Sequence, residues 1–240
     1  MRLMKLQPRL FLLPVLLATS ISNADVISDL MARAEKGEAA AQLELAAIHA
    51  AGEGVAKDQA AAARWIVKAA EQGDVPAQVM LGHRYLKGEG VARSVEEALK
   101  WFSKAAEQGD PEAQMALGKI HLAGKGVKRN SIEAVRWFLM SAEQGHPAAQ
   151  CQMGRMHMAG AGVSLDNVEA YKWCTLAAEQ GDEAARKIAA VLAMRMTPEQ
   201  LEFGRQLALD HEAMRKAAKA VELPSDVPQV LPTELPEEPE

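Results

Sequence analysis

Aromatic residues, cysteines and runs of positive charge are all scarce in this chain of 240 residues. Only 4% of its residues are aromatic, and it contains two cysteines, too few for a disulfide framework. No basic run or basic patch with interleaved aromatic residues indicates a nucleic-acid partner. Alanine, by contrast, is abundant and favours helix over strand, and 49% hydrophobic residues are ample for the core of one globular unit.

The first 24 residues differ in composition from the rest. Three basic residues precede a short apolar stretch, 10–18, and small polar residues follow up to Ala24. This order is typical of a secretory signal peptide, and we predict that residues 1–24 are one, cleaved after Ala24. The alternative is an uncleaved membrane anchor, but the apolar stretch is about half of the roughly 20 residues that a spanning helix needs.

Export would place the mature protein in an oxidising compartment, and a bacterial periplasm fits best. The formal net charge of the whole chain is −5, and cleavage removes three positive charges and no negative ones, which leaves −8. We therefore expect a soluble acidic protein with no stable membrane insertion after signal cleavage.

A period of 36 residues runs through the chain. It is marked by five glycines and by every tryptophan that the chain contains: Gly37, Gly73, Gly109, Gly145 and Gly181, and Trp65, Trp101, Trp137 and Trp173. An Ala-Gln pair, a Gly-x-Gly-Val segment and a closing Ala-Glu-Gln-Gly segment recur in the same register. Such a period indicates a solenoid, because one helical hairpin buries its apolar face only by stacking against its neighbours.

The second unit, 73–108, shows how one hairpin is specified. Asp74 is the expected N-cap of a first helix that ends at Gly88, where the chain needs a positive φ to turn. Ser94 begins the second helix and is expected to form a capping box with Glu97. The residues equivalent to Ser94 in the other units are also strong caps: Asp58, Asn130 and Asp166.

We therefore predict an all-α protein, an α/α solenoid (superhelix) of helix-turn-helix repeats. Thr197 is the expected N-cap of a last helix that runs to about Val221, with Gln200 closing its capping box. The acidic, proline-rich tail is expected to be disordered, and it is either an inert solubilising segment or a ligand for a partner. The predicted units are a capping helix (25–36), four repeats (37–72, 73–108, 109–144 and 145–180), a C-terminal cap (181–221) and the tail (222–240).

The second repeat carries a family motif almost in full: Ala77, Gln78, Leu81, Gly82, Tyr85, Gly88, Gly90, Val91, Ala98, Trp101, Lys104, Ala105 and Ala106. This motif resembles the Sel-one-like repeat, a branch of the tetratricopeptide superfamily. The resemblance covers residues 37–180 strongly and 181–221 as a terminal cap. It implies right-handed stacked helix pairs and, most often, an adaptor role in bacterial envelope or signalling assemblies, without naming the partner.

In tetratricopeptide-like arrays the first helices line the concave wall, so the resemblance also implies a groove. The residues three before, one after and four after the repeated glycine of each first helix should face it. In repeats two to four these are Val79, His83, Leu86, Met115, Lys119, Leu122, Cys151, Arg155 and Met158. They predict an apolar groove with a basic stripe, suited to an acidic or carboxylate-ended peptide with apolar anchors. The alternative is that the basic residues are merely solvated and that the apolar ones are partly core.

Metal and phosphate chemistry find little support in the sequence. His49, His121 and His157 share one register with Tyr85, but equivalent Cα atoms in adjacent repeats are separated by roughly 8–10 Å. Two rings therefore do not readily meet one zinc ion at about 2.0–2.1 Å, and we predict packing residues, no metal and no cofactor. The Gly-x-Gly turns follow a helix and lack the Lys-Ser/Thr ending of a phosphate-binding loop.

Cys151 and Cys174 lie on the two predicted helices of the fourth repeat, where export would permit a disulfide. The sequence does not give the distance between their Cα atoms, so a disulfide and two small buried thiols both stand as alternatives.

We predict a non-catalytic periplasmic scaffold or adaptor that binds a protein or peptide partner, with an acidic one favoured. One alternative follows from the resemblance, because cysteine-rich relatives bind or hydrolyse β-lactams. Here alanine and glutamine, such as Ala106 and Gln114, hold the places of their cysteine pairs, and no Ser-x-x-Lys motif is present. The other alternative is a periplasmic regulator of a sensor kinase.

Overall fold

The computed structural model describes residues 23–221, and every regular element in that range is a helix. The predicted tail lies outside the described residues, as does the predicted signal peptide up to residue 22. The helices are α1 (Asn23–Glu35), α2 (Ala39–Ala51), α3 (Gln59–Glu71), α4 (Val75–Lys87), α5 (Val95–Glu107), α6 (Pro111–Ala123), α7 (Ser131–Glu143), α8 (Pro147–Ala159), α9 (Asn167–Glu179), α10 (Glu183–Ala193) and α11 (Pro198–Val221).

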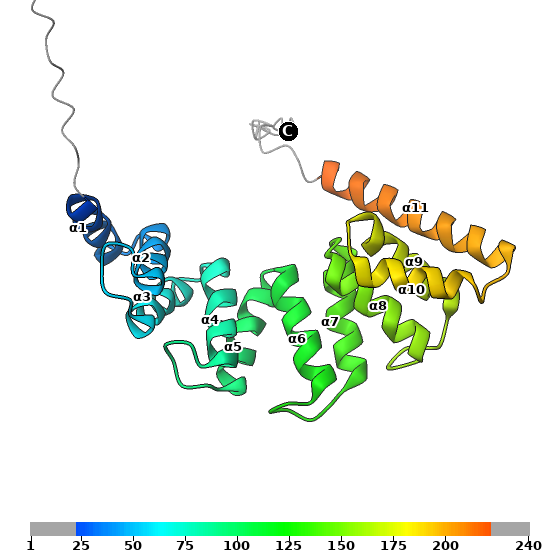
Figure 1. Cartoon of the computed structure of the whole chain (residues 1–240), viewed down its shortest axis with the longest axis horizontal. Coiled ribbons are helices and arrows are strands. Elements are labelled where there is room, and N and C mark those ends of the chain that lie inside the picture. Colours follow the sequence, from blue (N-terminus) through cyan, green and yellow to red (C-terminus); the bar gives the residue numbers. More distant parts are fainter. Residues whose placement is uncertain (1–22, 222–240) are drawn as a thin grey trace, which may run out of the picture.

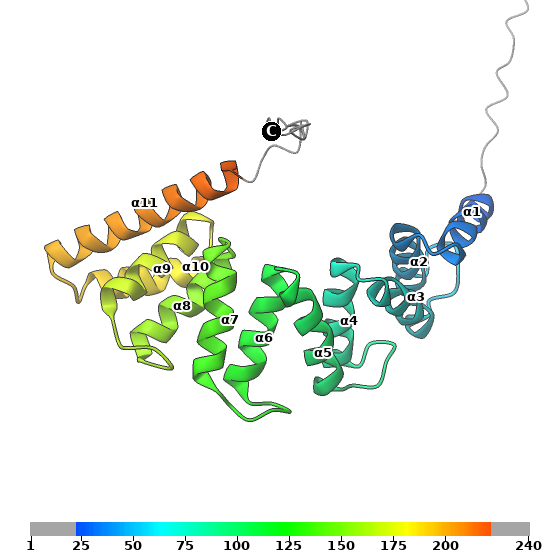
Figure 2. The ribbon, with the colours of Figure 1, turned by 180° about the vertical axis from the view of Figure 1, so that it is seen from behind.

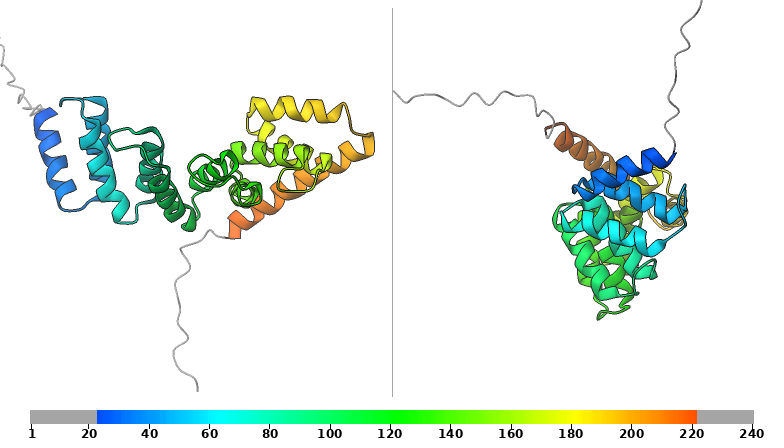
Figure 3. Two further views of the ribbon diagram at one scale, coloured as in Figure 1. Left: turned by 90° about the horizontal axis from the view of Figure 1, so that it is seen from below. Right: turned by 90° about the vertical axis from the view of Figure 1, so that its left-hand side faces the viewer.

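The helices form an arch of stacked hairpins, which confirms the predicted α/α solenoid (Figure 1). The four hairpins pair α2 with α3, α4 with α5, α6 with α7, and α8 with α9, and each hairpin packs on the next. Helix α1 covers the first hairpin, while α10 and α11 cover the last. Figure 3 shows that the described part of the chain is elongated when it is seen from below and narrow when it is seen from the α1 end.

A glycine in the first helix allows the two helices of a hairpin to approach closely. A Cβ atom on Gly82 would lie 2.7 Å from a ring carbon of Phe102, and one on Gly118 would lie 2.5 Å from the ring of Phe138. Both phenylalanines are fully buried, so their rings have little room to move. The first repeat solves the same problem with a smaller pair: Ala46 stands where the glycine would be, and Ile66 where the ring would be.

Buried glutamines connect each first helix to two second helices. In the second repeat, the Gln78 amide donates to the Ala70 carbonyl of α3 at 3.2 Å and accepts from Gln108, at the end of α5, at 2.9 Å. The same two bonds recur around the equivalent glutamines, all of which are buried: Gln42, Gln114 and Gln150. The recurring Ala-Gln and Ala-Glu-Gln-Gly segments therefore build one network across the four repeats.

The predicted caps form, with one correction. The Ser94 hydroxyl accepts from the Glu97 N–H at 3.1 Å, but the return bond of a capping box is missing. The Ser94 N–H donates instead to the Tyr85 carbonyl at 3.0 Å, so the Glu97 carboxylate is left to pair with Lys100. The side chains that cap the other second helices also accept backbone N–H groups: Asp58, Asn130 and Asp166.

Helix α11 folds back across the end of the solenoid and packs on α9 (Figure 2). Its N-terminus carries both bonds of a capping box, Thr197 N–H to Gln200 at 3.0 Å and Gln200 N–H to Thr197 at 3.3 Å. Gly204 lets α11 approach α9, because a Cβ there would lie 2.9 Å from the Tyr171 ring. The last turn of α11 consequently points back toward the middle of the arch (Figure 1).

The glycine–phenylalanine contact yields a stability prediction. Gly118→Ala should lower the free energy of unfolding by about 1–3 kcal/mol, because the new methyl group overlaps the Phe138 ring. Adding Phe138→Ile rebuilds the Ala46–Ile66 pair of the first repeat and should recover part of this loss. Urea unfolding of the two single variants and the double variant measures the coupling; purely additive effects would contradict the proposed clash.

Candidate functional site

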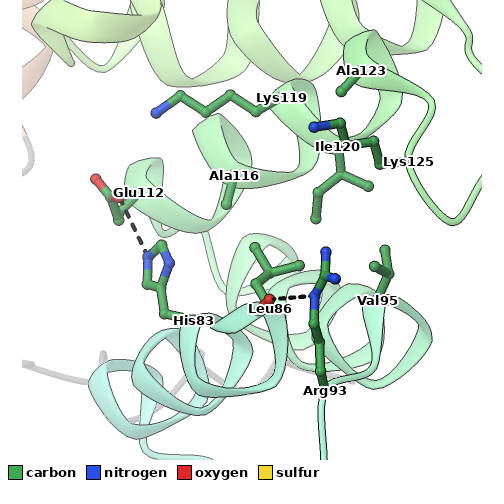
Figure 4. A pocket seen from close by; sticks show the side chains of 10 residues that line it. All are labelled: His83, Leu86, Arg93, Val95, Glu112, Ala116, Lys119, Ile120, Ala123 and Lys125. Atoms are coloured by element: carbon green, nitrogen blue, oxygen red, sulfur yellow. Dashed lines mark hydrogen bonds and ion pairs between the residues drawn. The ribbon is translucent and has the colours of Figure 1, made fainter. Parts of the chain in front are cut away.

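A cavity of about 260 Å³ opens between α4 and α6, the first helices of the second and third repeats (Figure 4). Leu86 projects from α4 toward Ala116 and Ile120 on α6, and these side chains form an apolar floor. We call this space the α4–α6 cavity. Its lining residues are His83, Leu86, Arg93, Val95, Glu112, Ala116, Lys119, Ile120, Ala123 and Lys125.

Three cations surround the apolar floor: Arg93, Lys119 and Lys125, all exposed. The Arg93 guanidinium donates to the Leu86 carbonyl at 3.0 Å, which fixes it at the C-terminal end of α4. Lys119 and Lys125 lie on the opposite wall (Figure 4). Among residues 23–221, no carboxylate forms an ion pair with either lysine, so both ammonium groups are available to a ligand.

The one acidic residue of the wall, Glu112, is already engaged. One carboxylate oxygen lies 3.6 Å from Nε2 of His83 on α4, and the other lies 3.1 Å from Nε2 of His146, the N-cap of α8. Nδ1 of His146 accepts the Ala149 N–H at 3.3 Å, so its ring proton is on Nε2, where it donates to Glu112. A single carboxylate thus links three successive repeats.

These neighbours change the acidity of Glu112. Burial alone would raise its pKa, but the hydrogen bond from His146 and the electrostatic contributions of His146, His83 and Lys119 outweigh burial. The pKa of Glu112 is therefore lowered from its ordinary value, and the carboxylate stays ionised and bound to the histidines.

The structure brings three of the nine predicted groove residues to the α4–α6 cavity: His83, Leu86 and Lys119. Arg155 is exposed but lies on α8, away from this cavity. Three more of the predicted groove residues are apolar and half-buried, and they pack against core clusters: Val79, Leu122 and Met158.

The prediction that Met115 and Cys151 line a groove is wrong, because both are buried, at 1% and 4% exposure. The position three before the repeated glycine faces the following unit instead. Met115 packs with Met153 and Trp173 of the fourth repeat, and Cys151 packs with the residues at the start of α10.

The rule that places groove residues relative to the repeated glycine of each first helix did not predict most of the residues that line the cavity. Arg93 and Lys125 come from the loops that follow those helices, and Glu112 comes from the first turn of α6. One signal was available in the sequence: Lys125 stands where the first two repeats have Glu53 and Glu89. Another was His146, which holds an N-cap position that is Asp74, Asp110 and Asp182 in other units.

The two cysteines are free, buried thiols in one small cluster. Burial, with a further contribution from nearby Cys151, raises the pKa of Cys174 to about 12. Burial also raises the pKa of Cys151, which the nearby Arg155 only partly offsets. Both groups are therefore protonated at neutral pH and are poor nucleophiles.

The three histidines of this register share one backbone contact. The carbonyl of each accepts the N–H group of the cap that follows it, at 2.9–3.1 Å: His49, His121 and His157. Among residues 23–221, no group of three or more His, Cys, Asp or Glu side chains is arranged to hold a metal ion. Within the same range, no helix has the length and hydropathy to cross a membrane.

Stacked helical hairpins with a cavity between successive first helices define a helical-repeat interaction module. The Sel1 repeat model matches residues 39–74, 75–110, 111–146 and 147–182, and the chain belongs to the Sel1 repeat family. Proteins of this family typically act as non-catalytic scaffolds for protein–protein interaction.

Two solved structures support this assignment. The protein c5321, a protective antigen present in uropathogenic Escherichia coli strains, displays an SLR fold and is 32% identical, with a TM-score of 0.72. The match covers 91% of this chain and 48% of c5321, so this chain spans about half the length of that protein. A Sel1 repeat protein from Oxalobacter formigenes is 31% identical over 77% of this chain and 78% of its own, with a TM-score of 0.65. Comparison with curated proteins returned no match.

The lowered pKa of Glu112 gives a pH-dependent prediction. A carboxylate whose pKa is lower when folded contributes stability above its unfolded pKa, and this contribution is lost as the pH falls through the folded value. Glu112→Gln should therefore make the urea midpoint less sensitive to pH between about 5 and 3. The control is Glu107→Gln, an exposed carboxylate on α5. Parallel curves for Glu112→Gln and the parent chain would show that the histidine contacts contribute nothing.

Proposed function

We propose that this chain is a non-catalytic periplasmic scaffold that holds an acidic segment of a protein partner in the α4–α6 cavity. The observation that carries the proposal is an apolar floor surrounded by three cations, in a protein whose overall charge is −5. A segment with one aliphatic anchor and flanking carboxylates matches both features. Steering by Lys119 and Lys125 would raise the association rate and favour acidic partners over others.

The size of the cavity favours a peptide over a small-molecule cofactor. Its volume of about 260 Å³ lies below the roughly 300–1,000 Å³ typical of small-molecule sites. One or two side chains of an extended peptide fill such a space, while the peptide backbone runs along the groove between α4 and α6.

The state of the cysteines supports a non-catalytic role. A cysteine nucleophile must be a thiolate, and burial keeps both Cys151 and Cys174 protonated. These thiols also lie in the fourth repeat, away from the residues that line the α4–α6 cavity.

Photo-crosslinking in intact cells tests the proposed binding site. A photoreactive amino acid in place of Ala123, at the edge of the cavity, should form an adduct with a peptide rich in Asp or Glu. Lys119→Glu with Lys125→Glu should reduce the adduct about tenfold, because both free cations are reversed. The matched control carries the same amino acid in place of Ala159, the equivalent exposed position of the fourth repeat. Identical adducts from both positions, or adducts insensitive to the charge reversal, would overturn the proposal.

The periplasmic location rests on the composition of residues 1–24 and is tested separately. Cell fractionation should recover the protein with the periplasmic contents, and sequencing of its N-terminus should begin at Asp25. A membrane-bound protein that retains Met1 would show that the segment is an anchor instead.

A further inference from the structure

The last described turns of α11 lie beside the turn that leads into α8. Arg215 and Lys219 of α11 share a hollow with Glu143 and Gln144 at the end of α7. The Arg215 guanidinium also lies against Gly145, where an added Cβ would be 3.0 Å from it. The next residue is His146, whose ring bonds to Glu112 in the wall of the α4–α6 cavity. The last described turns of α11 are therefore next to the turn that carries His146, which is bonded to the wall of the cavity.

The residues that follow α11 have the chemistry that the cavity selects. In residues 222–240, an aliphatic residue precedes a proline every four residues: Leu223-Pro224, Val227-Pro228, Leu231-Pro232 and Leu235-Pro236. The segment has no Lys or Arg and six carboxylates: Glu222, Asp226, Glu234, Glu237, Glu238 and Glu240. Residues that precede proline favour extended conformations, so less conformational entropy is lost when such a segment binds.

We propose that residues 222–240 of this chain dock in its own α4–α6 cavity, with an aliphatic–proline pair on the apolar floor and carboxylates beside Lys119 and Lys125. This inference rests on the proposed function, which states the kind of segment that the cavity binds. It adds that residues 222–240 are one such segment. The cations that would meet it have no carboxylate partner among residues 23–221.

The length of the segment permits this docking. Nineteen residues in an extended, proline-rich conformation span roughly 59 Å, at about 3.1 Å per residue. A helix of 13 residues, such as α6, is only about 20 Å long. Because the segment is tethered, its effective concentration at the cavity is of the order of millimolar, so even a weak interaction fills the site.

Docking of this kind would make the segment a competitor of the partner. A partner must then bind more tightly than the tethered segment, which restricts the cavity to ligands with better anchors or more carboxylates. Removing the carboxylates of the segment should open the cavity and raise partner binding.

Photo-crosslinking of the purified mature chain, residues 25–240, tests the proposal. A photoreactive amino acid in place of Leu231 should crosslink within one chain to α4 or α6, as mapped by mass spectrometry. Glu234→Gln, Glu237→Gln and Glu238→Gln together should reduce this crosslink about fivefold or more, as should Lys119→Glu with Lys125→Glu. The matched control is Lys36→Glu with Lys187→Glu. It reverses two exposed lysines, one directly after α1 and one on α10, and should leave the crosslink yield unchanged.

Two results would overturn the inference. Crosslinks scattered over other helices would show that the segment does not dock in the cavity. Crosslinks that join an isotopically labelled chain to an unlabelled one would show that a second copy provides the occupant. Neither result bears on the adducts that join Ala123 to another protein, which mass spectrometry separates from crosslinks within the chain. If those adducts fail while Leu231 crosslinks to α4 or α6, the proposed function falls and this inference stands.

Discussion

The buried glutamine in each first helix is bonded on both sides, and the geometry of the solenoid follows from satisfying it. A buried amide that loses a partner costs roughly 1–3 kcal/mol. The Gln78 side chain therefore requires the end of α3 and the end of α5 to lie at fixed positions around α4. Because the same requirement recurs at Gln114, the spacing between α4 and α6 is set as well. The α4–α6 cavity exists in the space that this spacing leaves.

Positions that are the same in every repeat build the framework, and positions that differ between repeats create the site. The glutamines, the glycine turns and the caps recur with the period and carry no information about a partner. Lys125 in place of a glutamate and His146 in place of an aspartate are departures from the period. Both departures affect the α4–α6 cavity. Lys125 lines it, and His146 bonds to Glu112 in its wall.

Glu112 decides how the charges of the cavity are used. Its carboxylate is bound by His83 and His146, so Lys119, Lys125 and Arg93, which form no ion pair with a described carboxylate, are left to face a ligand. A carboxylate ligand therefore meets two free ammonium groups and a guanidinium next to an apolar floor. Both proposals, an external acidic partner and docking of residues 222–240, rest on this arrangement.

The sequence by itself determined the repeat, the helix limits and most of the caps, because these depend on residues within a few positions of one another. It also predicted His83, Leu86 and Lys119 on one surface. Only the tertiary structure decided that Met115 and Cys151 are buried, that α11 folds back on α9, and that Glu112 bridges two histidines. Each residue along a helix is rotated by about 100°, so a small change in how neighbouring repeats stack moves a side chain from groove to core. That stacking angle depends on contacts between residues 30 or more positions apart, such as Gln78 and Gln108, and on the fit of α11 against α9.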